Sequence, residues 1–266
     1  MEFLKIVKRR SFLNEAVYVA LNVALSVSMM LLIRTTGSIY PAFGLVLLSK
    51  WRIFAVRPRF WFANIQTNMV SFIVSVSFVV FLYITGQANI SESQILVSQI
   101  LLVLLDIAWL VLLKPQSKRV YVVTQAGVAL FAGITAIFSV SYGWLSSVAV
   151  LLTWLVGYAV ARHVLNSYDN ESHTLFLSLA WGLVLAEIGW LAYHWTIAYR
   201  LPFISNLLLP QVSIITLCFG FLTFKSYDSY YHHQKIRFID IILPLIFTVG
   251  IAAMLLIAFN SVTTGA

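Results

Sequence analysis

Charged residues are scarce in this sequence. Only 10% of the 266 residues are Asp, Glu, Lys or Arg, whereas 61% are hydrophobic, and the mean hydropathy is +0.93. Soluble domains carry about 25% charged residues, so a water-soluble globule of this length could not cover its surface with polar side chains. The shortage of charge excludes that class and indicates a protein that folds within a lipid bilayer.

Cysteine and catalytic motifs are scarce as well. The one cysteine, Cys218, lies inside an apolar run, and a single thiol cannot form an intramolecular disulfide. The sequence contains no G-x-S-x-G, H-E-x-x-H or Walker motif, and its histidines follow no metal-ligand spacing. The sequence therefore leans against an enzyme and predicts neither a metal nor a cofactor.

Long apolar runs are what the sequence has in their place. Each covers roughly 17–25 residues, the length that a helix needs to cross about 30 Å of hydrocarbon. The prediction is an all-α fold with one domain over residues 1–266, a bundle of nine transmembrane helices. The expected helices cover residues 16–33, 38–49, 60–84, 94–113, 120–140, 144–161, 174–198, 203–224 and 238–259.

The basic residues fall in every second gap between these runs. Of the 17 Lys and Arg residues, all except Arg34 and Arg200 lie in those alternate gaps. The positive-inside rule places such gaps in the cytoplasm. The protein is therefore predicted to cross the cell membrane nine times, with a cytoplasmic N-terminus and an external C-terminus. If the short run 38–49 is re-entrant instead, the division weakens to twelve against five.

Three segments are predicted on the cytoplasmic side. They are the basic N-terminal segment 1–14, the basic and aromatic loop 50–59, and the Tyr- and His-rich loop 225–237. The cations of the second loop, together with Arg162, are candidates for binding an anionic lipid headgroup or a phosphate. Alternatively they only set topology. The candidate residues are Lys50, Arg52, Arg57, Arg59 and Arg162. Because the positive charge sits at the ends of apolar runs, we expect membrane lipids and no nucleic acid as partners.

Two acids lie deep inside the expected helices. Asp106 is about 10 Å from the inner end of helix 94–113, and Glu187 is near the middle of helix 174–198. A charged side chain at such depth is costly and usually faces the bundle interior or a cavity. His194 follows Glu187 by two helical turns on the same face. These three residues are the candidates for proton handling. The alternative is that each acid is neutral and hydrogen-bonds a neighbouring helix, and that His194 is an interfacial anchor.

These residues favour a transporter-like function. The hypothesis is that the protein moves a small solute or a lipid, with proton or cation coupling through the buried carboxylates. Two alternatives stay open: a non-catalytic subunit or scaffold of a membrane protein complex, with a membrane protein as partner, and a membrane-embedded enzyme that modifies lipids.

Overall fold

The computed structural model describes residues 2–53, 55, 57–141, 143–169, 171–195, 197–201 and 204–259. Side chains are described from residue 14 onward, except those of residues 52, 200, 201 and 204–206. Within these ranges the chain forms nine α-helices: α1 (Glu2–Thr36), α2 (Tyr40–Ser49), α3 (Trp61–Gly86), α4 (Glu92–Ala108), α5 (Arg119–Val140), α6 (Ser146–Leu165), α7 (Thr174–His194), α8 (Gln211–His233) and α9 (Phe238–Ala253).

Shorter elements complete the chain. Two 3-10 turns, η1 (Trp51–Ile53) and η2 (Pro58–Phe60), connect α2 to α3. Two π-helical turns, η3 (Trp109–Leu113) and η4 (Met254–Ala258), continue α4 and α9. One hairpin of strands β1 (Ala198–Leu201) and β2 (Ile204–Pro210) lies between α7 and α8.

Seven of the helices are long and apolar enough to span a membrane. They confirm the predicted all-helical membrane class, because a backbone inside lipid must satisfy its hydrogen bonds within the helix. The other two are α2 and α8. The ten residues of α2 cover only about 15 Å, and α8 combines an apolar first half with a polar second half. The nine crossings and the placement of the termini stay predictions.

The predicted helix 203–224 is wrong in its first third. Residues 204–210 form strand β2, which pairs antiparallel with β1, with Ala198 opposite Pro210. Pro210 immediately precedes the first residue of α8. Proline is compatible with that place, since it cannot donate the backbone hydrogen bond that a helix interior requires.

The predicted loop 225–237 is mostly helical. α8 continues to His233, and the chain then turns through Gln234, which has a positive φ of 56°. The polar side chains of this last part of α8 contact the α6–α7 loop. Tyr227 donates a hydrogen bond to Glu171, and Tyr231 donates one to the backbone oxygen of Asp169. These contacts stabilise the helix in this segment. The sequence predicted a loop here because few of its residues are apolar.

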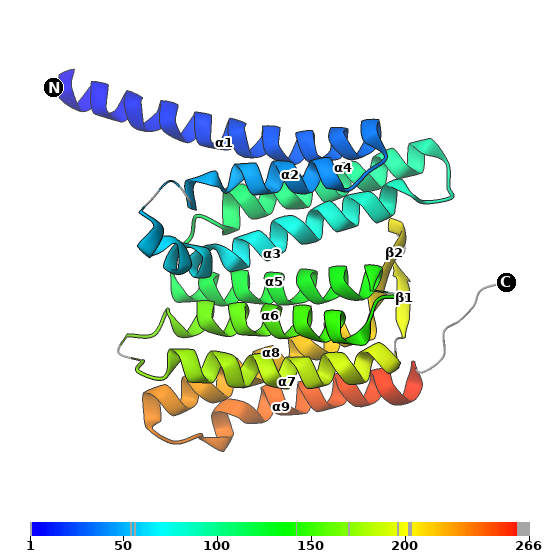
Figure 1. Cartoon of the computed structure of the whole chain (residues 1–266). Coiled ribbons are helices and arrows are strands. Elements are labelled where there is room, and N and C mark those ends of the chain that lie inside the picture. The colour runs from blue at the N-terminus through cyan, green and yellow to red at the C-terminus, as the bar shows by residue number, and fades with distance from the viewer. Residues whose placement is uncertain are drawn as a thin grey trace.

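The helices lie side by side with roughly parallel axes (Figure 1). In that view α1 begins at the left-hand end and α9 ends at the right-hand end. The α4–α5, α6–α7 and α8–α9 connections gather on the left, and the α3–α4 connection and the β-hairpin lie on the right. Consecutive helices, α2 included, therefore run in alternate directions, so α1 and α3 point the same way.

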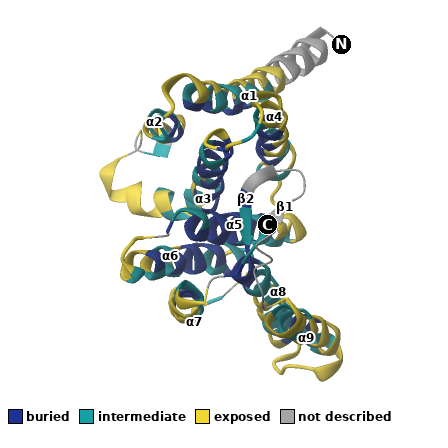
Figure 2. Ribbon diagram, turned by 90° about the vertical axis from the view of Figure 1, so that its right-hand side faces the viewer, coloured by how far each residue is buried: buried dark blue, intermediate teal, exposed yellow. Residues whose placement is uncertain are grey.

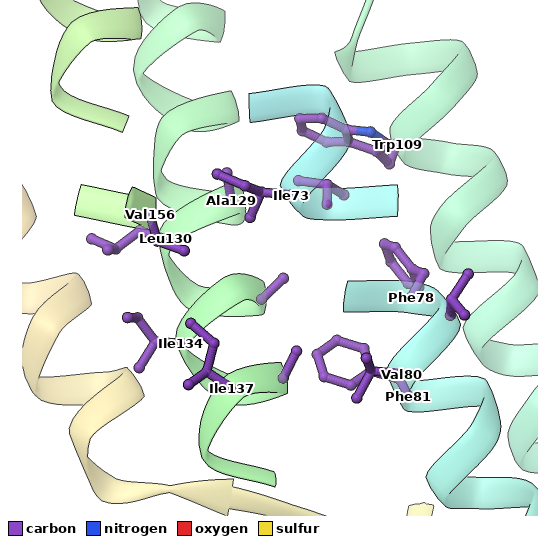
Figure 3. Packing of buried hydrophobic residues seen from close by; sticks show 14 of the residues in the cluster. Ile73, Phe78, Val80, Phe81, Trp109, Ala129, Leu130, Ile134, Ile137 and Val156 are labelled. Atoms are coloured by element: carbon purple, nitrogen blue, oxygen red, sulfur yellow. The ribbon is translucent and has the colours of Figure 1, made fainter. Parts of the chain in front are cut away.

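The best-buried helices are α3 and α5, and α7 and α9 carry exposed outer faces (Figure 2). α5 is rich in small residues on its buried side, which lets its neighbours approach closely. A Cβ added at Gly133 would come within 2.9 Å of Ile73 in α3 and 3.1 Å of Val156 in α6. Figure 3 shows this packing, with α3 lying between α5 and the α4 helix that leads to Trp109.

Candidate functional site

Asp106 is the most deeply buried acid in the described part of the chain, with a side chain that is 1% exposed. It lies on α4 where α4 packs against α1. Ser26 of α1 donates a hydrogen bond of 2.6 Å to its Oδ2 atom. The other oxygen, Oδ1, is buried without a hydrogen-bond partner among the described residues. Buried polar atoms are almost always paired, so this oxygen is available to accept a hydrogen bond from a water or another donor.

Asp106 belongs to a line of polar residues along one face of α4. Glu92, Gln99 and Asp106 follow one another at intervals of seven residues, which is close to two helical turns. Gln99 donates a hydrogen bond of 3.2 Å to the backbone oxygen of Leu82, while its own side-chain oxygen is buried without a partner in the described structure. We call the residues Glu92, Gln99, Asp106 and Lys114 the polar face of α4.

The π-helical turn at the end of α4 brings Lys114 onto this face. Its backbone N–H bonds to the oxygen of Trp109, five residues earlier. Such a turn contains one more residue than an α-helical turn. In a regular α-helix, residue 113 would be the next to share the face of Asp106, and the extra residue gives that place to Lys114. π-Turns are frequent at functional sites.

Two lysines lie near Asp106. Lys50, just after α2, is half-buried, and its Nζ donates a hydrogen bond of 2.7 Å to Ser71 in α3. The charges of Lys50 and Lys114 act on each other and on Asp106. The cluster holds two lysines and one acid, a set that disfavours a bound metal cation. No group of three potential metal ligands occurs among the described residues either.

A small cavity continues the polar face toward the right-hand end of Figure 1. It has a volume of about 160 Å³ and is bounded by parts of α1, α3 and α4. Its lining includes Arg34, Glu92 and Gln99. Polar groups therefore follow α4 from this cavity through Gln99 to Asp106 and on to Lys114.

A second, larger cavity lies along other faces of α4. It has a volume of about 1150 Å³ and is bounded by helices α3 to α8. Nearly all its lining is apolar, and it includes Leu102, Leu105 and Ala108 of α4 and Trp109 of η3. Leu105 and Phe221 line the cavity and are also exposed at the surface of the bundle, so the cavity opens sideways.

Glu187 lies elsewhere. It is exposed on the outer face of α7 and lines neither of the two cavities. His194 contacts the ring of Trp190, with the ring centroids 5.2 Å apart. Glu187 and His194 are therefore both exposed on α7, with Trp190 between them in sequence, and the structure joins neither to Asp106.

The basic candidate residues divide into two sets. Arg57 and Arg59 are exposed, and Arg59 lies over the ring of Phe60 at 4.6 Å. The side chain of Arg52 lies outside the described residues. Lys50 and Arg162 point into the protein, where Arg162 donates a hydrogen bond of 3.1 Å to the hydroxyl of Tyr158. Among the candidate side chains that the structure describes, those of Arg57 and Arg59 are the ones exposed for binding a headgroup.

A cluster that the sequence did not reveal joins α5, α8 and the α6–α7 loop. The guanidinium of Arg119 lies 4.3 Å from the ring centroid of Tyr168, which donates a hydrogen bond of 3.0 Å to Asp228. Burial and this hydrogen bond raise the pKa of Tyr168 above its ordinary value. The cluster satisfies its own charges, and we interpret it as a structural clamp. Arg119 and Tyr168 are 49 residues apart in sequence, and Tyr168 and Asp228 are 60 apart, so no local signal predicts the cluster.

The sequence did carry a signal for the polar face of α4. The seven-residue spacing of Glu92, Gln99 and Asp106 is visible in the printed chain, but the prediction used only Asp106. Comparison of the whole chain with protein-family models, with curated proteins and with solved structures found no match.

Proposed function

We propose that the protein is a transporter-like, multi-pass protein of the cell membrane that couples proton movement at Asp106 to movement of a small apolar solute or a lipid. The observation that carries the proposal is the polar face of α4, with the partly unpaired carboxylate of Asp106 at its centre. Ionisable residues at membrane depth commonly mark proton relays and substrate paths.

The charges near Asp106 favour a proton over a metal cation. A sodium or divalent ion prefers several oxygen ligands and a negative surrounding, whereas the neighbours of Asp106 here are two lysines, Lys50 and Lys114. A proton needs one acceptor and a chain of polar groups. Gln99, Ser26 and the small cavity beside Arg34 are suited to complete that chain.

The apolar cavity favours a hydrophobic or amphipathic substrate. Its lining offers almost no hydrogen-bonding groups, and it opens sideways at Leu105 and Phe221. A molecule that enters from the bilayer interior meets such an opening without crossing water. Because α4 lines this cavity and also carries Asp106, a shift of α4 on protonation of Asp106 would change the shape of the cavity.

The predicted topology sets the direction of this path. Nine crossings place Arg34 and Glu92 outside and Lys114 in the cytoplasm. In this arrangement α2 makes the second crossing and the basic loop 50–59 lies in the cytoplasm. The polar face of α4 then runs from the external side to the cytoplasmic side.

Proteoliposomes test the proposal. The protein is reconstituted with a pH-sensitive dye inside, fluorescent phosphatidylcholine as the lipid probe, and an imposed pH gradient. We expect Asp106→Asn to slow proton entry by about a hundredfold, because positioned proton-transfer groups contribute factors of this order. Glu187→Gln is the matched control, an acid-to-amide change in a membrane helix away from the path, and it should keep the wild-type rate. Wild-type proton flux in Asp106→Asn would exclude Asp106 from the mechanism.

A second candidate function is a subunit of a membrane protein complex. The exposed acid on α7 favours it, because the described chain offers Glu187 no partner. The two candidates are compatible, since they rest on different helices.

A further inference from the structure

The two sides of α7 differ sharply. One side packs closely on α6 through glycines: a Cβ at Gly189 would lie 2.8 Å from Thr153, and one at Gly182 would lie 3.1 Å from Trp154. The opposite side is exposed and apolar, with Leu183, Trp190 and Leu191 each more than half exposed. Glu187 lies among these three residues. We call Leu183, Glu187, Trp190 and Leu191 the outer face of α7.

Glu187 has no partner within this chain. It makes no hydrogen bond or ion pair with any residue that the structure describes. It is seven residues from the end of α7 at His194, so about 10 Å from that end along the helix axis. A glutamate side chain is too short to reach the interface from there, and an unpaired charge facing hydrocarbon is costly. An acid in this position is stabilised by a cation or by a hydrogen-bond donor at the same depth.

We propose that the outer face of α7 binds a transmembrane helix of another protein, one that carries Arg or Lys at the depth of Glu187. Charged residues within membranes commonly pair with one another. The apolar neighbours Leu183, Trp190 and Leu191 would pack around such a pair and exclude lipid from it. The proposal is independent of proton movement at Asp106, because it uses a different helix and a different surface.

Charge complementarity identifies this partner as a different chain. A symmetric pair of copies would place Glu187 against Glu187, which brings like charges together. Within the seven candidate spans, each Lys or Arg lies within three residues of an end of its span. Within these seven spans a second copy therefore offers no cation at the required depth, whereas a helix of different sequence can.

A defined peptide probe tests the inference. The protein carries a donor fluorophore on Ser117→Cys in a Cys218→Ser background and is reconstituted in phosphatidylcholine vesicles. The acceptor-labelled probes are Leu/Ala transmembrane peptides with Arg, Gln or Leu at the central position. We expect the central-Arg peptide to associate about tenfold more tightly than the central-Leu peptide, measured by energy transfer. Glu187→Gln should remove the preference, and Glu15→Gln, a control on α1, should keep it.

Trp190→Ala gives a second check that does not depend on charge. It reduces the apolar contact between the outer face of α7 and a bound helix. The association of all three peptides should therefore weaken by a similar factor, and the preference for the central-Arg peptide should remain. Equal association of the Arg and Leu peptides with wild type would overturn the inference, and so would an unchanged preference in Glu187→Gln. Energy transfer between labelled copies without peptide, lost in Glu187→Gln, would assign the face to a second copy and overturn it too.

Discussion

Two acids of similar chemistry have opposite surroundings in this protein. Asp106 is enclosed between α1 and α4 and receives a hydrogen bond from Ser26, whereas Glu187 is exposed on the outer face of α7. The sequence predicted both as deep acids, because depth along a helix follows from counting residues. It could not predict which face each acid occupies, because that depends on which helices pack together. The same residue-level signal thus gave one candidate for proton movement and one for binding a partner.

A pH-dependent contact lies at Glu171, in the loop between α6 and α7. Hydrogen bonds from the Tyr227 hydroxyl and from the backbone N–H of His173 lower the pKa of Glu171 below its ordinary 4.5. A lowered pKa means that the contact stabilises the folded protein fully above 4.5 and is lost as the pH falls through the lowered value. We expect Glu171→Gln to lower the melting temperature near neutral pH and to have no effect in strongly acidic buffer.

Tyr227→Phe provides the matched control for that experiment, since it removes the donating hydroxyl and keeps the ring. In this background the effect of Glu171→Gln at neutral pH should shrink. An effect of Glu171→Gln that stayed constant with pH would contradict the assigned contact.

At the scale of helices and strands, the sequence predicted most of the fold. Runs such as 120–140 match helices closely, because a membrane helix is determined by its own apolar length. The helix prediction for the region around β2 was wrong for a physical reason. A short apolar run reads equally as helix or strand, and the strand at 204–210 exists only because it pairs with Ala198–Leu201. The predicted end of this helix at residue 224 was also wrong, because Tyr227 and Tyr231 contact a loop that is distant in sequence and the helix continues.

The packing of α6 on α7 gives a prediction at this scale. A side chain at Gly189 would meet Thr153 at 2.8 Å, so Gly189→Leu should force the two helices apart. Overpacking of this kind costs about 1–3 kcal/mol, which should appear as a lower melting temperature in detergent. Gly250→Leu is the matched control, because it gains the same helix propensity in α9 and nothing lies within 4 Å of an added Cβ there. Equal melting temperatures for the two variants would contradict the close approach.

At the scale of the whole molecule, α4 separates two environments. Polar residues from α1, α3 and α4 surround Asp106, while the apolar cavity lies among α3 to α8. The sequence could not reveal this division, because apolar runs look alike whether they face lipid, protein or a cavity. It did supply the charge asymmetry from which orientation follows.

Orientation is therefore the prediction that concerns the whole chain. Ile90 lies in the α3–α4 connection and Ser117 in the α4–α5 connection, on opposite ends of the 22-residue span Glu92–Leu113, which is about 33 Å long. In a Cys218→Ser background, an impermeant maleimide added to intact cells should label Ile90→Cys and should label Ser117→Cys only after permeabilisation. Thr36→Cys, at the exposed end of α1, should behave like Ile90→Cys if α2 crosses the membrane. If Thr36→Cys instead shares the compartment of Ser117→Cys, that crossing does not occur and the N-terminal helix has the opposite orientation. Labelling of Ile90→Cys and Ser117→Cys from the same side would show that α4 does not span, and a proton path along its polar face would then have no gradient across it.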